Sequence, residues 1–138
     1  MKIKISTQGF NDIIDITDKV AEAVKKSKTK DGLVLVFVPH QTCAITVLEN
    51  EPGLIQDLKD LLEKIAPLKA GYRHDAAWDE GNGAAHLLAS LFKPDLAIPL
   101  ESGQLILGTW QKIILIDFDN RPRQREVIIK ILKDSGKG

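Results

Sequence analysis

Several features that would narrow the class of this 138-residue protein are scarce or missing from its sequence. It has one cysteine, Cys43, so a disulfide within one chain is impossible. The longest apolar runs, such as LVLVFV, have the length of a strand and are too short to cross a membrane. The start, MKIKISTQGF, lacks the apolar run of a signal peptide. We therefore expect a cytoplasmic protein with no membrane partner.

An excess of charge of either sign is missing as well. The 19 Lys and Arg residues balance the 19 Asp and Glu residues. Broad electrostatic binding of nucleic acid or of an anionic membrane needs a basic excess, so we expect no nucleic-acid partner. A near-neutral protein also resists self-association less, which is compatible with an oligomer.

Hydrophobic periodicity predicts an α+β protein with a mostly antiparallel, sandwich-like β core and about three helices. No repeat or linker divides the chain, so we expect a single domain over 1–138. The predicted helices cover 20–28, 54–65 and 83–93, and 67–80 is predicted to be a loop. Strands are predicted at 2–6, 11–16, 33–38, 42–48, 96–100, 104–108, 110–118 and 125–132.

The helix predicted at 83–93 carries His86 away from its apolar residues. At 100° per residue, Ser90 lies within about 40° of His86 on the polar face. Asn82 is a natural N-cap, and the free N–H groups of the first turn favour a site for an anion. A solvated helix face with an incidental histidine is the alternative. The apolar residues expected to cover the opposite face are Ala84, Ala85, Leu87, Leu88, Leu91 and Phe92.

All three histidines lie at the boundaries of predicted elements, where functional side chains are often displayed. His40 follows a buried strand, His74 lies in the loop before the helix, and His86 lies near the helix start. They are candidate general acids or bases, because histidine titrates near neutral pH. They are also candidate ligands of a divalent metal such as zinc, and would then converge within about 4–5 Å.

The stretch HQTCAITVLEN, residues 40–50, places two polar residues at the end of a predicted strand. Glu49 is a candidate carboxylate for proton transfer or for a metal, and a solvated strand end is the alternative. Cys43 lies among apolar neighbours with no nearby base in the sequence. It is therefore predicted to be a small buried residue and not a nucleophile.

Two further motifs contain residues that could contact a polar ligand. In GTWQ, Trp110 is either a core residue or part of a site, and Gln111 could orient a ligand. In RPRQRE, Arg121, Arg123 and Arg125 alternate and could clamp a phosphate or carboxylate. A charged hairpin tip is the alternative for the arginines.

Taken together, these motifs resemble the YjbQ-like family, also called secondary thiamine-phosphate synthases. The resemblance rests on H-x-T-x-A-x-T-x-x-E-N over 40–50, Y-x-H over 72–74, N-x-x-A-H-L-x-x-S-L over 82–91 and L-G-T-W-Q over 107–111. Leu48 departs from the pattern, which has a polar residue there. The resemblance implies a small α+β homotrimer with a His-rich polar cleft. The matching residues are His40, Thr42, Glu49, Asn50, His74, Asn82, His86, Ser90, Trp110 and Gln111.

The resemblance also implies a substrate and a reaction. The family name points to a transferase that joins phosphorylated pyrimidine and thiazole molecules into thiamine phosphate. That reaction displaces pyrophosphate and needs stabilisation of the leaving anion, which the helix start, Arg123 or a divalent ion (Zn²⁺ or Mg²⁺) could supply. The alternatives are a metal-dependent hydrolase using His40, His74 and His86, and a non-catalytic trimer that binds a small anion.

Overall fold

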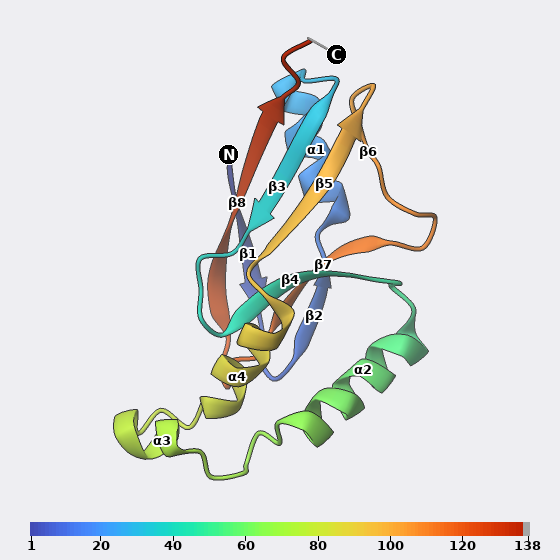
Figure 1. Ribbon diagram of the computed structural model, residues 1–138. Coiled ribbons are helices and arrows are strands. Elements are labelled where there is room, and N and C mark those ends of the chain that lie inside the picture. Colours follow the sequence, from blue (N-terminus) through green and yellow to red (C-terminus); the bar gives the residue numbers. More distant parts are fainter. Residues whose placement is uncertain (137–138) are drawn as a thin grey trace.

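A computed structural model describes residues 1–136, which form two antiparallel sheets and four helices (Figure 1). The larger sheet has the order β1-β8-β3-β5-β6, and the smaller has the order β2-β7-β4. The strands of the larger sheet are β1 Lys2–Thr7, β8 Arg123–Lys133, β3 Gly32–Phe37, β5 Asp95–Glu101 and β6 Gln104–Leu105. Those of the smaller sheet are β2 Asp12–Asp15, β7 Lys112–Asp117 and β4 Cys43–Leu48.

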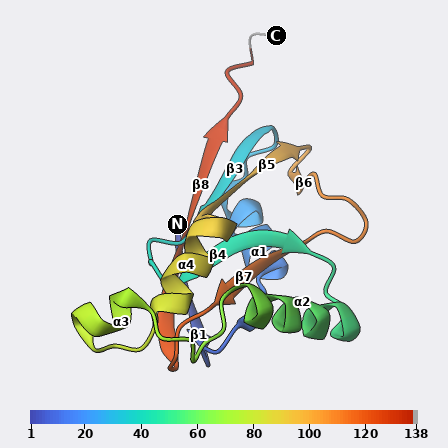
Figure 2. The same ribbon diagram turned by 60° about the horizontal axis from the view of Figure 1, so that its bottom comes forward.

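The helices lie on both sides of the smaller sheet. They are α1 Thr17–Ser27, α2 Pro52–Ile65, α3 Arg73–Trp78 and α4 Gly83–Phe92. Figure 1 shows α1 behind the larger sheet, whereas α2, α3 and α4 gather at the other end of the molecule. Seen from that end, α4 lies against β4 (Figure 2).

Strand β7 belongs to two hydrophobic cores because its side chains alternate between two faces. Ile113 and Leu115 pack in the core between the two sheets and α1. Ile114 and Ile116, with Phe118 just beyond the strand, pack in a second core that includes residues of α2 and α4. The second core fixes the position of α4, which carries His86.

The prediction of an α+β fold with an antiparallel, sandwich-like β core is confirmed, with four helices in place of about three. The additional helix, α3, lies within the predicted loop 67–80. It has only six residues and buries none of them, so it lacks the apolar periodicity that identifies a helix. Strand β6 ends at Leu105, because the chain turns away from the sheet before β7.

The predicted apolar face of α4 is partly wrong. Leu88 is buried with the three alanines of the helix, but Leu87 is 51% exposed and Leu91 is 63% exposed. The alanines allow the helix to lie close to β4, and only a narrow stripe of the helix then faces the core. Within residues 1–136, no helix is long and apolar enough to span a membrane.

Candidate functional site

His74 and His86 form a pair where α3 meets α4. Their ring centroids lie 4.3 Å apart, and the ring planes are tilted by 51°. The two rings line a pocket of about 570 Å³ together with Arg73 and the neighbouring residues Gly71, Tyr72, Gly83 and Leu87. The pair was not obvious from the sequence, because His74 was placed in a loop of undefined geometry.

The surroundings of His86 favour its neutral imidazole. Burial, followed by the charge of His74, lowers the pKa of His86 below the usual histidine value. His74 Nε2 is buried and has no hydrogen-bond partner among residues 1–136. A neutral histidine can accept a proton near neutral pH.

The start of α4 is not the free anion site that the sequence predicts. Asp75 Oδ1 accepts a hydrogen bond from Gly83 N at 2.7 Å and so already occupies this end of the helix. Asn82 is at the N-cap position, but its side chain makes no capping bond. A Cβ at Gly83 would lie 2.6 Å from Tyr72 Cβ. This close approach of the backbone to Tyr72 holds α3 against α4 and brings His74 to His86.

His40 lies in the connection between β3 and β4 and lines a different pocket. This pocket has a volume of about 240 Å³ and also includes Ser90 and Lys93. His40 Nε2 accepts a hydrogen bond from Glu126 N at 3.3 Å. Burial, and then the nearby Arg125 guanidinium, lowers the pKa of His40.

The predicted three-histidine metal site does not form in the described part of the chain. His74 and His86 are adjacent, but His40 lines another pocket and its Nε2 is engaged by Glu126. Across residues 1–136, no group of three or more His, Cys, Asp or Glu side chains is placed to hold a metal ion. Two ring nitrogens alone do not make the four-coordinate set that zinc prefers.

Four other candidate residues lie at the opposite end of the β4–β7 pair. Cys43 pairs with Asp117 at one end, and Leu48 pairs with Lys112 at the other. A six-residue strand is roughly 20 Å long. Glu49 and Asn50 follow β4, and Trp110 and Gln111 precede β7, so one chain does not bring them to the histidine pair.

At that distant end, the side chains make local contacts. Asn50 Nδ2 donates to Asp15 Oδ2 at 3.2 Å, and Gln111 Oε1 accepts from Gly108 N at 2.8 Å. Trp110 is 70% exposed, so it is not a core residue. Glu49 is exposed after the strand, as the solvated alternative expected.

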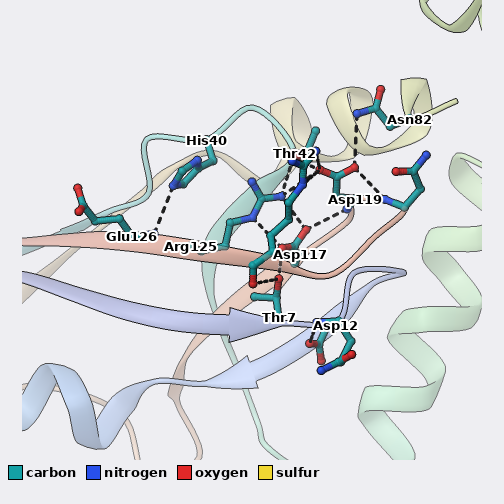
Figure 3. Close-up of polar contacts among 12 residues, drawn as sticks. Thr7, Asp12, His40, Thr42, Asn82, Asp117, Asp119, Arg125 and Glu126 are labelled. Carbon is teal, nitrogen blue, oxygen red and sulfur yellow. Dashed lines mark hydrogen bonds and ion pairs between the residues drawn. The ribbon is translucent and has the colours of Figure 1, made fainter. Parts of the chain in front are cut away.

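A buried charge network under the site was missed by the sequence analysis (Figure 3). Asp117 and Asp119 are fully buried. Arg125 binds Asp117 through two hydrogen bonds of 2.7 and 2.9 Å, and reaches Asp119 at 3.3 Å. The alternation of acids at 117 and 119 and of arginines at 123 and 125 could have revealed it, because alternate residues of a strand share a face.

Three predicted ligand-binding residues belong to this network. Arg123 Nε and Nη2 both lie 2.9 Å from Asp119 Oδ2, so its guanidinium is already held. Thr42 Oγ1 donates to Asp119 at 3.0 Å, and Asn82 Nδ2 donates to it at 3.4 Å. Of the three predicted clamp arginines, Arg123 and Arg125 therefore bind the protein's own carboxylates, and Arg121 is exposed. Because Asn82 precedes α4, the network also ties the start of this helix to the sheet.

Cys43 is 1% exposed, and burial raises the pKa of its thiol to about 12. A thiol with such a pKa is protonated at neutral pH and is a poor nucleophile. The prediction of an inert buried cysteine is confirmed.

The fold and the site define an antiparallel α+β protein with a histidine-lined pocket between two helices. The family model described as "UPF0047 protein YjbQ-like" matches residues 1–134. The chain therefore belongs to the YjbQ/UPF0047 family, as its sequence motifs predicted.

Relatives and solved structures agree with this assignment. A UPF0047 protein of Archaeoglobus fulgidus is 44% identical over 132 residues, which are 96% of this chain and 100% of the relative. A crystal structure from Sulfolobus solfataricus, described as a "YbjQ-like protein of unknown function", matches with a TM-score of 0.90 at 33% identity and covers 97% of this chain and 96% of that one. A YjbQ/UPF0047 structure from Clostridium acetobutylicum matches with a TM-score of 0.88 at 39% identity, over 96% and 99% of the two chains.

Proposed function

We propose that this chain is an enzyme acting on a small phosphorylated metabolite at the pocket between α3 and α4. The observation that carries the proposal is the His74–His86 pair, with ring centroids 4.3 Å apart in the wall of a pocket of about 570 Å³. Arg73 also lines this pocket and provides a cation for a phosphate group. In the described chain, Arg73 has no salt-bridge partner within 4.0 Å.

The proposed reaction is a group transfer of the thiamine-phosphate-synthase type, in accordance with the family resemblance. A thiazole nitrogen displaces pyrophosphate from the pyrimidine methylene carbon, so a C–N bond forms as a C–O bond breaks. Arg73 stabilises charge on the leaving anion, and this stabilisation is the main requirement of the step. Neutral His86, whose pKa is lowered, donates a hydrogen bond from its ring N–H to the leaving pyrophosphate, and no proton transfer is needed in this step.

The test is an assay of thiamine phosphate and released pyrophosphate with purified protein, pyrimidine diphosphate and thiazole phosphate. We expect turnover by the wild type and a loss of about 100-fold or more in His86→Ala, the usual range for removing a hydrogen-bond donor to developing negative charge. Lys25→Ala, which changes an exposed residue of α1 outside the pocket, is the control and should retain the rate. Equal rates in wild type and His86→Ala contradict the proposal.

A metal-dependent hydrolase is the second candidate, and the close approach of two imidazole rings, with centroids 4.3 Å apart, favours it. The pair offers two ring nitrogens to a divalent ion, and the remaining ligands would come from water, substrate or another copy of the chain. Elemental analysis of protein purified without added metal tests this candidate. Stoichiometric zinc that is lost in His74→Ala supports it, and metal-free protein contradicts it.

We also propose, from the family resemblance, that the protein is a homotrimer. Leu87 and Leu91 give α4 an exposed apolar surface next to the histidine pair, and Trp110 exposes another at the far end of β4–β7. Such surfaces often mark contacts between proteins. Sedimentation equilibrium should give about three times the chain mass, and a monomer at micromolar concentration contradicts the proposal.

A further inference from the structure

The smaller pocket beside His40 has a lining suited to an anion. Its volume is about 240 Å³, enough for a phosphate group. Its lining includes the imidazole of His40 and the ammonium of Lys93, and contains no acidic side chain. Ser90 also lines it, but its hydroxyl donates to Leu87 O at 2.7 Å. The full lining is Phe37, Val38, Pro39, His40, Gln41, Cys43, Ala89, Ser90, Lys93 and Pro94.

His40 is held in a form that donates a hydrogen bond. Its Nε2 accepts from Glu126 N at 3.3 Å, and a ring nitrogen that accepts carries no proton. The proton of the neutral ring is therefore on Nδ1. Within residues 1–136, Nδ1 makes no hydrogen bond, so it is available to a ligand.

Lys93 has a backbone conformation that suits glycine. Its φ is 69° and its ψ is 158°, a region that other residues adopt only with strain. The conformation is fixed from both sides, because Lys93 N donates to Ala89 O at 3.0 Å and Lys93 O accepts from Ile45 N at 3.2 Å.

The side chain of Lys93 gives no structural reason for a lysine at this strained position. The residue is exposed, and its ammonium makes no salt bridge in the described chain. Strain in the backbone is often found at functional sites, where the side chain has a role that outweighs the strain. A free ammonium at the edge of an acid-free pocket fits the binding of an anion.

We propose that His40 and Lys93 form a second subsite, beside Ser90 of α4, which binds a phosphate group. Ser90 is four residues after His86 on α4, so the subsite lies about 6 Å farther along the helix axis than the histidine pair. One face of α4 thus serves two neighbouring pockets. The role of the second subsite in turnover rests on the proposed function. Each pocket would hold one phosphorylated substrate, and α4 would set the distance between the two substrates.

The binding test uses inorganic phosphate as the probe, with calorimetry and NMR of the three histidine rings. We expect saturable binding that shifts His40 in the wild type. Lys93→Gly, which removes both the ammonium and the strain, should bind on the order of tenfold more weakly, the effect of one charge-assisted hydrogen bond. Lys93→Arg should retain binding, because it keeps the positive charge.

A second variant separates this subsite from the histidine pair. In His86→Ala, phosphate should still shift His40 with unchanged affinity. Binding that is equal in wild type and Lys93→Gly, or phosphate that leaves His40 unshifted, overturns the subsite. If those results overturn the subsite but His86→Ala has lost turnover, the proposed function stands without the subsite. If His86→Ala keeps full turnover while Lys93→Gly loses phosphate binding, the subsite stands and the proposed function fails.

Discussion

Replacing Lys93 by glycine should stabilise the protein, although most substitutions destabilise one. The strained conformation at φ 69°, ψ 158° costs about 1–3 kcal/mol for a residue other than glycine. Glycine removes that strain but loses more backbone freedom on folding, at a cost of about 0.5–1 kcal/mol. The expected net gain in the free energy of unfolding is therefore about 0.5–2 kcal/mol.

Urea unfolding followed by circular dichroism measures this gain, and thermal unfolding should show a rise of roughly 2–8 °C. Lys93→Ala is the matched control, because it removes the side chain and keeps the strain. Lys28→Gly is a second control and should give a smaller gain in the free energy of unfolding, because the left-handed conformation of Lys28 at φ 57°, ψ 15° is less strained than that of Lys93. If Lys93→Gly is no more stable than Lys93→Ala, the strain argument is refuted.

Three further predictions concern the scaffold of the site. Asp119→Asn should lower the free energy of unfolding by about 1–3 kcal/mol in urea, because Arg123 loses its carboxylate partner while Arg125 keeps only Asp117. Burial alone would raise the pKa of Asp119, but hydrogen bonds from Asn120 N and Thr42 and the charge of Arg123 lower it overall. The stabilisation from ionised Asp119 is therefore complete above the ordinary Asp pKa of about 4, and it is lost as the pH falls through the lowered pKa of the folded protein. If the free energies of unfolding of wild type and Asp119→Asn change in parallel below pH 4, this prediction is contradicted. Gly83→Ala should separate α3 from α4 and weaken NMR contacts between His74 and His86, because its Cβ would meet Tyr72 at 2.6 Å; unchanged contacts would argue against this packing. Cys43 should react with a thiol reagent only after unfolding, since burial raises its pKa to about 12, and rapid labelling of the folded protein would show otherwise.

Local patterns predicted most of the fold, because each regular element has its own period. The alternation of β1 and the helical spacing of α2 are visible in the sequence, and both elements form close to the predicted limits. Helix α3 could not be predicted, because tertiary contacts hold it. Asp75 binds the start of α4, and the backbone of Gly83 meets Tyr72.

The candidate site was predicted as a set of residues but not as an arrangement. Motif matching identified His74 and His86, which the fold brings together. It also grouped Glu49 and Trp110 with them, although one chain holds these at the other end of a strand pair. Distances of this kind depend on strand register and helix packing, which the residue types in a motif do not encode.

Binding of a phosphorylated substrate in the pocket of His74 and His86 can be measured directly. With only three histidines in the chain, their ring signals can be assigned by single substitutions and followed by NMR during titration with thiazole phosphate. We expect the His74 and His86 signals to shift together and reach saturation, and we expect the substitution of Arg73 by alanine to weaken the binding. If both signals stay unchanged up to millimolar ligand while the protein remains folded, binding in this pocket is contradicted.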